Sequence, residues 1–130
     1  MTQSLAAIAL LVPDYDQAIA YYTAVMGFEL LEDTPREPGK RWVRVAPPGS
    51  TGTCLLLARA STDAQRARIG DQTGGRVGLF LHTDDFMRDH RMLSTRGVHF
   101  REAPRHESYG TVAVFEDCYG NAWDLIEPRA

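Results

Sequence analysis

The order of predicted secondary-structure elements in the first half of the chain occurs again in the second half. In each half an apolar strand leads into a helix capped by an aspartate, the helix ends at a glycine, and further strands follow. The matching positions are Asp14-Tyr15 with Asp85-Phe86 at the helix starts, and Gly27-Phe28 with Gly97-Val98 at the helix ends. An internal repeat constrains the fold more than any single residue does. The sequence therefore predicts an α+β fold of two βαβββ modules.

The first module is predicted over about residues 4–60, and the second over about residues 76–128. The first module has a helix after Asp14 with one apolar stripe, and a turn-rich loop over Thr34–Gly39. Its strands are predicted at Leu5–Val12, Phe28–Leu31, Arg41–Ala46 and Thr53–Ala58. The second module has a helix capped by Asp84 or Asp85, and a loop over Glu102–Ser108. Its strands are predicted at Val77–Thr83, Val98–Arg101, Thr111–Glu116 and Ala122–Glu127.

Residues 61–75 are predicted to link the two modules. The segment Thr62–Ile69 can form one short polar helix, and Gly70–Gly75 is rich in glycine and expected to be flexible. The linker is too short to separate independent domains, so we expect residues 1–130 to form one domain.

Composition excludes several classes of function. The chain has 14 Lys and Arg against 17 Asp and Glu, so its net charge is −3, and no basic cluster predicts a nucleic-acid partner. The apolar run Leu5–Val12 is far shorter than the roughly 20 residues of a membrane span and lacks the basic flank of a signal peptide. Cys54 and Cys118 have no metal or redox spacing, which favours a reduced, cytoplasmic protein.

Three segments carry a resemblance to a known family: Val12–Leu30, His82–Phe100 and Phe115–Pro128. They resemble the vicinal oxygen chelate superfamily, which includes glyoxalase I, extradiol dioxygenases, fosfomycin-resistance enzymes and bleomycin-resistance proteins. The first segment is similar to the family's passage from strand to helix, and the last is similar to its closing strand after a Gly-Asn turn. The resemblance implies that the two sheets form one open, partly closed barrel around a cavity, which usually holds a divalent metal.

The metal ligands that the resemblance implies are largely missing. The corresponding positions hold Ala7, Gly78, Leu55 or Leu56, and Asp124. Only Asp124 carries a donor, and a single carboxylate with water does not hold Zn, Ni or Fe tightly. We therefore expect no metal and no other cofactor. A relocated metal site at His82 and Asp124 would need a third ligand that the sequence does not identify.

Strand alternation selects the candidate site residues of the first module. Val43 and Val45 are expected to face the helix, so Trp42 and Arg44 are expected to face the cavity. Trp42 would form an aromatic wall, and Arg44 would bind a carboxylate, phosphate or enolate. The alternative is that Trp42 packs at a dimer contact and Arg44 is a surface cation.

In the second module, Asp124 lies between two apolar strand residues that are expected to face the helix. It would act as a general base or a polar anchor with a pKa raised by the apolar cavity, or it is an ordinary salt-bridged aspartate. His82 follows Phe80 at period two, so both are expected on the cavity face, where His82 is either functional or a structural histidine. Tyr109 lies on a loop that would cover the cavity or simply be exposed.

Three functions remain open from the sequence. The first is a divergent, metal-free enzyme of the lyase or isomerase type that acts on a small organic metabolite, with Asp124, His82 and Arg44 as catalytic residues and Trp42, Phe80 and Tyr109 as ligand-binding residues. The second is a ligand-sequestering protein like those that confer bleomycin resistance, without catalysis. The third is a member with a structural or partner-binding role. In each case we expect a homodimer, because sheet edges of this kind are commonly covered by a second subunit in the family.

Overall fold

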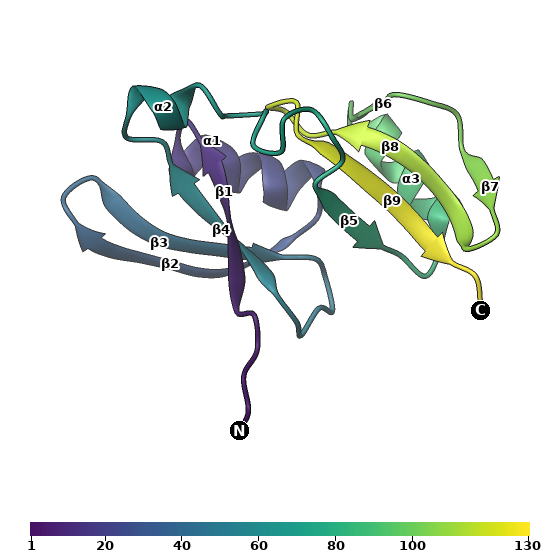
Figure 1. Cartoon of the computed structure of the whole chain (residues 1–130), viewed down its shortest axis with the longest axis horizontal. Helices are drawn as coiled ribbons and strands as arrows, with labels where there is room; N and C mark the ends of the chain where they lie inside the picture. Colours follow the sequence, from purple (N-terminus) through teal and green to yellow (C-terminus); the bar gives the residue numbers. More distant parts are fainter. The chain divides into compact units, whose positions relative to one another are not determined.

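The computed structural model describes all 130 residues, which divide into two compact units, residues 1–69 and residues 70–130 (Figure 1). Each unit contains one β-sheet and a helical segment that packs against it, so the predicted α+β fold with a repeated βαβββ order is confirmed. No helix has both the length and the apolar character needed to cross a membrane. The closure of the two sheets into one barrel stays a prediction.

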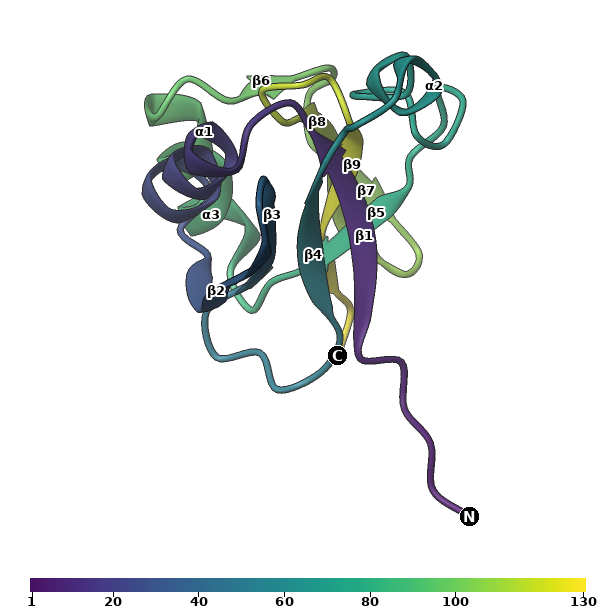
Figure 2. The same cartoon turned by 90° about the vertical axis from the view of Figure 1, so that its left-hand side faces the viewer.

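Unit 1 is built on a four-stranded sheet in the order β1-β4-β3-β2. Its elements are β1 (Ala7–Val12), α1 (Tyr15–Ala20), η1 (Tyr21–Val25), β2 (Glu29–Glu37), β3 (Lys40–Ala46), β4 (Cys54–Arg59) and α2 (Asp63–Arg66). Only β1 and β4 run parallel, and the other neighbours are antiparallel. The turned view shows α1 on one side of this sheet (Figure 2). The core of the unit lies between α1 and the sheet.

The helix of unit 1 begins where the sequence predicted. The Asp14 carboxylate accepts a hydrogen bond from the Gln17 backbone N–H at 2.8 Å, which makes Asp14 the N-cap. From Tyr21 the helix changes to a π-helical turn, which the apolar stripe did not predict. The hydroxyl of Thr23 donates to the Ile19 carbonyl at 2.7 Å, a side-chain bond that competes with the regular helical pattern.

The predicted loop at Thr34–Gly39 is wrong. β2 continues to Glu37 and β3 starts at Lys40, so the segment forms the end of a long hairpin. Pro35 is tolerated because β2 lies at the edge of the sheet, where a missing N–H costs no ladder bond. Gly39 has a φ of +79°, which the tight turn requires.

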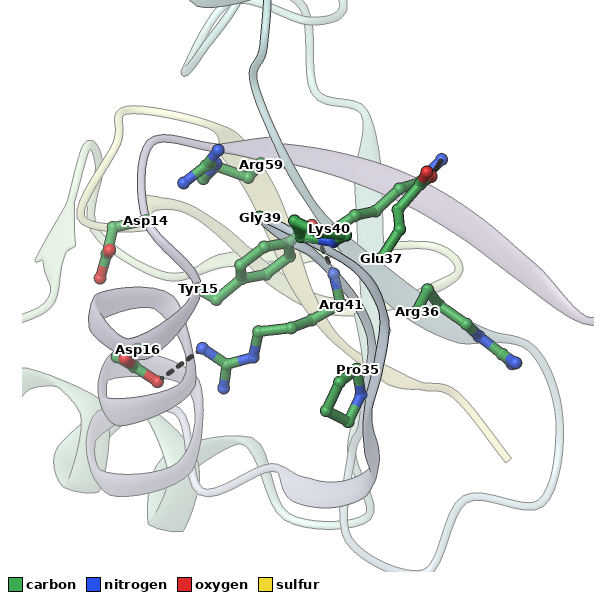
Figure 3. Close-up of a pocket in the computed structure, with 11 residues that line it drawn as sticks. Asp14, Tyr15, Asp16, Pro35, Arg36, Glu37, Gly39, Lys40, Arg41 and Arg59 are labelled. Carbon is green, nitrogen blue, oxygen red and sulfur yellow. Dashed lines mark hydrogen bonds and ion pairs between the residues drawn. The ribbon is translucent and has the colours of Figure 1, made fainter.

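Arg41 ties this hairpin to the start of α1 (Figure 3). Its guanidinium binds Asp33 at 2.7 Å and Asp16 at 2.9 Å, and its backbone N–H donates to the Tyr15 hydroxyl at 3.2 Å. The Asp33 hydrogen bond is the largest cause of a raised pKa for Arg41, and the same pair lowers the pKa of Asp33. The alternating pattern of β3 places Arg41 on the side of α1, which makes these contacts available.

Unit 2 contains a sheet in the order β5-β9-β8-β6, with β7 also paired to β8. Its elements are β5 (Leu79–His82), α3 (Phe86–Thr95), β6 (His99–Phe100), β7 (Arg105–Glu107), β8 (Gly110–Glu116) and β9 (Ala122–Pro128). As in unit 1, only the first and last strands, β5 and β9, run parallel. The two units therefore share a topology as well as an order of elements.

The predicted loop at Glu102–Ser108 is also wrong, because it contains β7. The Glu102 carboxylate lies in the gap between β6 and β7 and accepts the Val114 backbone N–H at 3.0 Å. The Val114 carbonyl in turn accepts the Arg101 N–H at 2.8 Å. A side-chain oxygen thus takes the place of a strand carbonyl, and β8 keeps its hydrogen bonds where its partner strand is interrupted.

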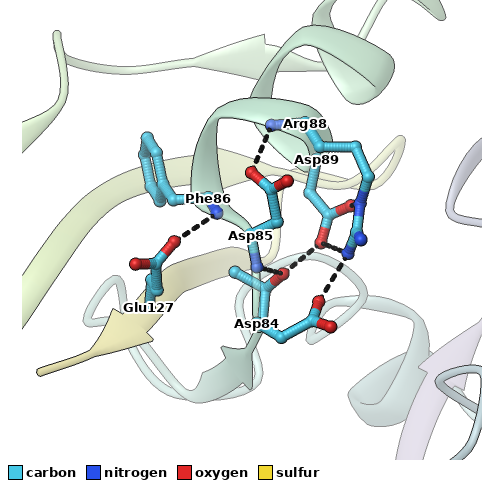
Figure 4. Close-up of polar contacts among 7 residues, drawn as sticks. Asp84, Asp85, Phe86, Arg88, Asp89 and Glu127 are labelled. Atoms are coloured by element: carbon cyan, nitrogen blue, oxygen red, sulfur yellow. Dashed lines mark hydrogen bonds and ion pairs between the residues drawn. The ribbon is translucent and has the colours of Figure 1, made fainter. Parts of the chain in front are cut away.

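The start of α3 is fixed by carboxylates (Figure 4). Asp85 is the N-cap and accepts the Arg88 N–H at 3.1 Å, which decides between the two predicted caps. Glu127 on β9 accepts the Phe86 N–H at 2.7 Å, and Asp84 binds the Arg88 guanidinium at 2.7 Å. The Phe86 and Arg88 N–H groups in the first turn of α3 are thereby paired, and Glu127 joins the helix to the last strand.

The turn that the sequence predicts before β9 is present, and its hydrogen bonds give it a structural role. The buried Asp117 carboxylate accepts backbone N–H groups from Tyr119 and Asn121, each at 3.0 Å, and the Asn121 side-chain amide at 2.8 Å. Desolvation, with the Asp117 charge beside it, raises the pKa of Cys118 to about 11. This thiol is therefore protonated at neutral pH, and no disulfide forms with Cys54.

The predicted linker is partly helical. The predicted helix over Thr62–Ile69 is shorter than expected, because α2 covers only Asp63–Arg66 and its N-cap Thr62 accepts the Gln65 N–H at 3.1 Å. Gly70, at the boundary of the units, has a φ of +77° and packs against the Tyr119 carbonyl, only 1.9 Å from where a Cβ would lie. This glycine is required by a close backbone contact.

Candidate functional site

The face of the unit 1 sheet opposite α1 carries two of the predicted site residues. Val43 and Val45 are completely buried on the side of α1, so Trp42 and Arg44 lie on the other side. We call that other side the open face of sheet 1. By strand register it comprises Ala7, Ala9 and Leu11 on β1, Cys54, Leu56 and Ala58 on β4, Trp42 and Arg44 on β3, and Glu32 and Thr34 on β2.

Arg44 is held in place by its neighbours on this face. Its Nε donates to the Glu32 carboxylate at 2.9 Å and its Nη1 lies 3.7 Å from the Cys54 sulfur. The hydrogen bond from Arg44, followed by one from the Thr34 hydroxyl, lowers the pKa of Glu32. The Nη2 group of Arg44 makes no hydrogen bond within the chain, so it can donate to a ligand from a fixed position.

Trp42 offers an aromatic surface on the same face. The side chain is half-buried, and the Arg36 guanidinium lies 5.5 Å from its ring centroid. On the neighbouring strands this face carries short side chains such as Ala9 and Ala58. The arrangement suits a flat molecule that contacts an aromatic ring and accepts a hydrogen bond from a cation.

The corresponding face of unit 2 carries three more predicted residues. Phe80 on β5 and Val114 on β8 are the register partners of Asp124, and His82 follows Phe80 by two positions. Trp123 and Leu125 are buried on the side of α3, as predicted from alternation. We call the side that carries Asp124 the open face of sheet 2. Its other members by register are Ile126, Val112 and Arg105.

Asp124 contains an unsatisfied buried atom. Its Oδ1 is fully buried and has no hydrogen-bond partner, which is uncommon for a carboxylate oxygen. Desolvation raises the pKa of Asp124, the Arg105 charge partly counters this, and the Glu102 charge adds to it. The carboxyl group is thus suited either to accept a hydrogen bond from a ligand or to hold a proton.

Arg105 lies beside Asp124. The sequence did not identify this cation as part of the site. Its Nε donates to Glu102 and its Nη1 to Glu107, each at 2.9 Å, and these hydrogen bonds raise its pKa. Its register partner Val112 places it on the open face of sheet 2. The segment was interpreted as a loop, and a loop offers no alternation from which its face could be predicted.

The remaining predicted residues are exposed. Phe80 has 60% of its surface accessible and Tyr109 has 52%, and His82 on β5 is also exposed. Tyr109 lies in the turn between β7 and β8, where its carbonyl accepts the Arg129 N–H at 2.9 Å. The structure therefore brings Phe80, His82 and Asp124 onto one sheet face, while Trp42 and Arg44 share the face of the other sheet.

The residues present do not fit a metal site of the kind that the resemblance implies. No group of three or more His, Cys, Asp or Glu side chains is placed to hold a metal ion. Of the implied ligand positions, Ala7, Gly78 and Leu55 or Leu56 provide no donor atom, and only Asp124 offers oxygen. No step that depends on such a metal is derived for this chain.

Comparison with known proteins agrees with the fold. The model of the Glyoxalase/Bleomycin resistance protein/Dioxygenase superfamily matches residues 4–125. A protein of Shewanella frigidimarina (strain NCIMB 400), described as uncharacterized, is 56% identical over 128 residues, covering 98% of this chain and 95% of that protein.

Two solved structures are similar over almost their whole length. One is a member of the same superfamily from Sphaerobacter thermophilus DSM 20745, with 29% identity, a TM-score of 0.82, and coverage of 97% of this chain and 98% of that one. The other is TnmS3 from Streptomyces sp. CB03234, described as an antibiotic binding protein, with 31% identity, a TM-score of 0.77, and coverage of 99% and 98%. The repeated βαβββ units, the match over residues 4–125 and these relatives show that the chain belongs to the Glyoxalase/Bleomycin resistance protein/Dioxygenase superfamily.

Proposed function

We propose that the chain binds and sequesters a small organic molecule, and that a flat part of this ligand stacks on Trp42 at the open face of sheet 1. The observation that carries the proposal is a half-buried tryptophan beside small side chains and next to a cation in a fixed position. A superfamily fold of this kind binds small molecules, and the half-buried ring adds a specific contact surface.

Arg44 would select the polar part of the ligand. Its Nε is already paired with Glu32, while its Nη2 has no partner within the chain. A ligand carbonyl, phenolate or carboxylate oxygen near the ring system would accept a hydrogen bond from that group. Because Glu32 neutralises much of the charge of Arg44, a neutral oxygen acceptor suits the site as well as an anionic one.

Sequestration is favoured over conversion for two reasons. The donor set on the open faces lacks the ligands of a metal-dependent enzyme. The relative TnmS3, which is 31% identical over nearly the whole chain, is described as an antibiotic binding protein. Binding without chemistry needs only shape, stacking and a few fixed polar groups, which the open face of sheet 1 supplies.

A thermal-shift screen with planar aromatic compounds tests this proposal. A ligand that binds only the folded state raises the melting temperature, and the shift should be strongly reduced in Trp42→Ala and Arg44→Gln. Arg66→Gln, at an exposed surface ion pair with Asp63, is the matched control and should keep the full shift. Equal shifts in all variants would contradict the proposed site.

The second candidate function is metal-free acid-base catalysis of the lyase or isomerase type, with Asp124 as the base and His82, on the same face of sheet 2, assisting. The buried, unpartnered Oδ1 of Asp124 and the raised pKa of this group favour it. The test is chromatography of a bound compound after long incubation with the protein. Product that forms with the native chain and not with Asp124→Asn would establish catalysis, and unchanged ligand would establish sequestration.

We further propose that the protein is a cytoplasmic homodimer. Besides β1 and β5, each sheet has an edge strand at its other side, β2 in unit 1 and β6 in unit 2, and a second subunit would cover such an edge. Light scattering during size-exclusion chromatography distinguishes the 14.5 kDa chain from its dimer, and cell fractionation tests the location. A monomer at high protein concentration would refute the first part.

A further inference from the structure

Unit 1 has a cavity that lies away from the open face of sheet 1. It measures about 580 Å³ and lies where the β2–β3 hairpin meets the start of α1 (Figure 3). Arg59, one of its lining residues, is the register partner of Val12, which is completely buried on the side of α1. Arg41 lies on the same side. The volume falls within the range of roughly 300–1,000 Å³ that is typical of small-molecule sites.

Most charges around this cavity are already paired. Arg41 binds Asp16 at 2.9 Å and Asp33 at 2.7 Å, so its guanidinium is already paired with two carboxylates. Lys40 lies 3.8 Å from Glu37 at the exposed end of the hairpin. These pairs contribute little net charge to the cavity, and a ligand would have to compete with a carboxylate to reach either cation.

Arg59 is the lining cation that has no such partner. It makes no ion pair or hydrogen bond with any residue of the chain, and its Nη2 lies against the hairpin turn, 3.4 Å from where a Cβ of Gly39 would stand. Asp14, which lines the same cavity, already accepts the N–H of Gln17 as the helix cap. Figure 3 shows Arg59 on the same side of the hairpin as the Tyr15 ring.

Tyr15 supplies a second polar group at the cavity. Only 7% of the residue is exposed, and its hydroxyl oxygen accepts the Arg41 backbone N–H at 3.2 Å. Because that oxygen acts as an acceptor, its own hydrogen remains for donation. A buried hydroxyl that has no acceptor for its hydrogen is most stable when a ligand oxygen provides one.

We propose that this cavity binds the anionic group of a small organic molecule, a carboxylate or a phosphate, with Arg59 as the ion-pair partner and the Tyr15 hydroxyl as a hydrogen-bond donor. Guanidinium binds both groups through paired N–H donors. Arg59 and Tyr15 lie on the opposite face of sheet 1 from Trp42, so this site differs from the proposed stacking site. A ligand bound here would contact the hairpin and the start of α1.

Nuclear magnetic resonance titration tests the proposal directly. Backbone amide signals of Gly39, Lys40 and Arg41 are followed while sodium acetate, inorganic phosphate or ethylammonium chloride is added at constant ionic strength. The full chain is compared with Arg59→Gln and Arg59→Lys. Arg66→Gln is the matched control, since it removes the same charge from the same unit outside the cavity.

Saturable shifts with acetate or phosphate support the proposal, and the stronger of the two identifies the preferred anion. Arg59→Gln should weaken this binding at least about tenfold, equivalent to about 1.4 kcal/mol. Arg59→Lys should bind with intermediate strength, and the control should bind as the native chain does. Shifts that do not saturate, that are equal in Arg59→Gln and the control, or that are larger with ethylammonium would overturn it.

Discussion

Replacing Asp124 by asparagine should make the protein more stable at neutral pH while it weakens any interaction that depends on the carboxylate. The Oδ1 atom of Asp124 is buried without a partner, and such an atom costs about 1–3 kcal/mol of desolvation, with a larger cost when the group carries a charge, which asparagine removes. The nearby Arg105 charge stabilises the carboxylate and offsets part of this desolvation free energy. The rest of the side chain is partly exposed. We therefore expect a net gain of about 1 kcal/mol, which corresponds to a rise in melting temperature of about 4 °C.

The pH dependence has a definite sign. The pKa of Asp124 in the folded chain lies above the ordinary value for an aspartate, so protonation favours the folded state. Protonated Asp124 contributes its full stabilisation below the pKa that this group has in the unfolded chain. The native protein loses that stabilisation as the pH rises through the pKa of the folded chain. The advantage of Asp124→Asn is therefore largest at neutral pH and shrinks as the pH falls.

Urea unfolding at a series of pH values measures the difference. Asp63→Asn, at a fully exposed carboxylate of a surface ion pair, is the control and should change the free energy of unfolding by less than about 0.5 kcal/mol. The reasoning is refuted if Asp124→Asn is less stable than the native chain at neutral pH and the deficit shrinks on acidification. That result would mean that the attraction to Arg105 outweighs the desolvation of the carboxylate.

Two further predictions concern the backbone. Glu102→Ala leaves the Val114 N–H without its acceptor at 3.0 Å and should lower the free energy of unfolding by about 2 kcal/mol. Chemical denaturation measures this loss, with Glu102→Gln as the control because it keeps an acceptor oxygen. If Glu102→Ala loses no more stability than Glu102→Gln, the Glu102 side chain is not the acceptor that stabilises β8. Gly70→Ala brings a Cβ to 1.9 Å from the Tyr119 carbonyl and should cost more than Gly74→Ala, which has a similar φ of +71° and nothing within 4 Å. Equal melting temperatures for these two variants would show that backbone conformation alone matters at Gly70.

The parts of the fold that follow from local chemistry could be predicted from the sequence. Asp14 and Asp85 can cap a helix because a short carboxylate reaches the free N–H groups of the first turn. Gly27 and Gly97 end the helices because φ values of 76° and 90° are open to glycine. Strand alternation also placed Trp42 and its neighbours on the correct faces, since burial of one set of side chains decides the orientation of the other.

The parts that depend on a distant partner could not be predicted. Residues 34–37 and β7 have turn-like sequences and become strands only because β3 and β8 offer backbone hydrogen bonds. Arg105 was missed as a neighbour of Asp124 for the same reason. The cavity at Arg59 depends on the meeting of α1 with the tip of a hairpin that the sequence did not indicate.

The central claim is that a ligand stacks on Trp42, and tryptophan fluorescence tests it most directly. The chain has two tryptophans, of which Trp123 is 3% exposed and Trp42 is half-buried on the open face of sheet 1. Titration of a planar compound found in the thermal-shift screen should change the emission of the native chain in a saturable way. The change should disappear in Trp42→Phe, which keeps an aromatic ring and should still bind by calorimetry with at most a modest loss of affinity. A full fluorescence change in Trp42→Phe, or calorimetric binding that Trp42→Ala leaves unaltered, would contradict the account.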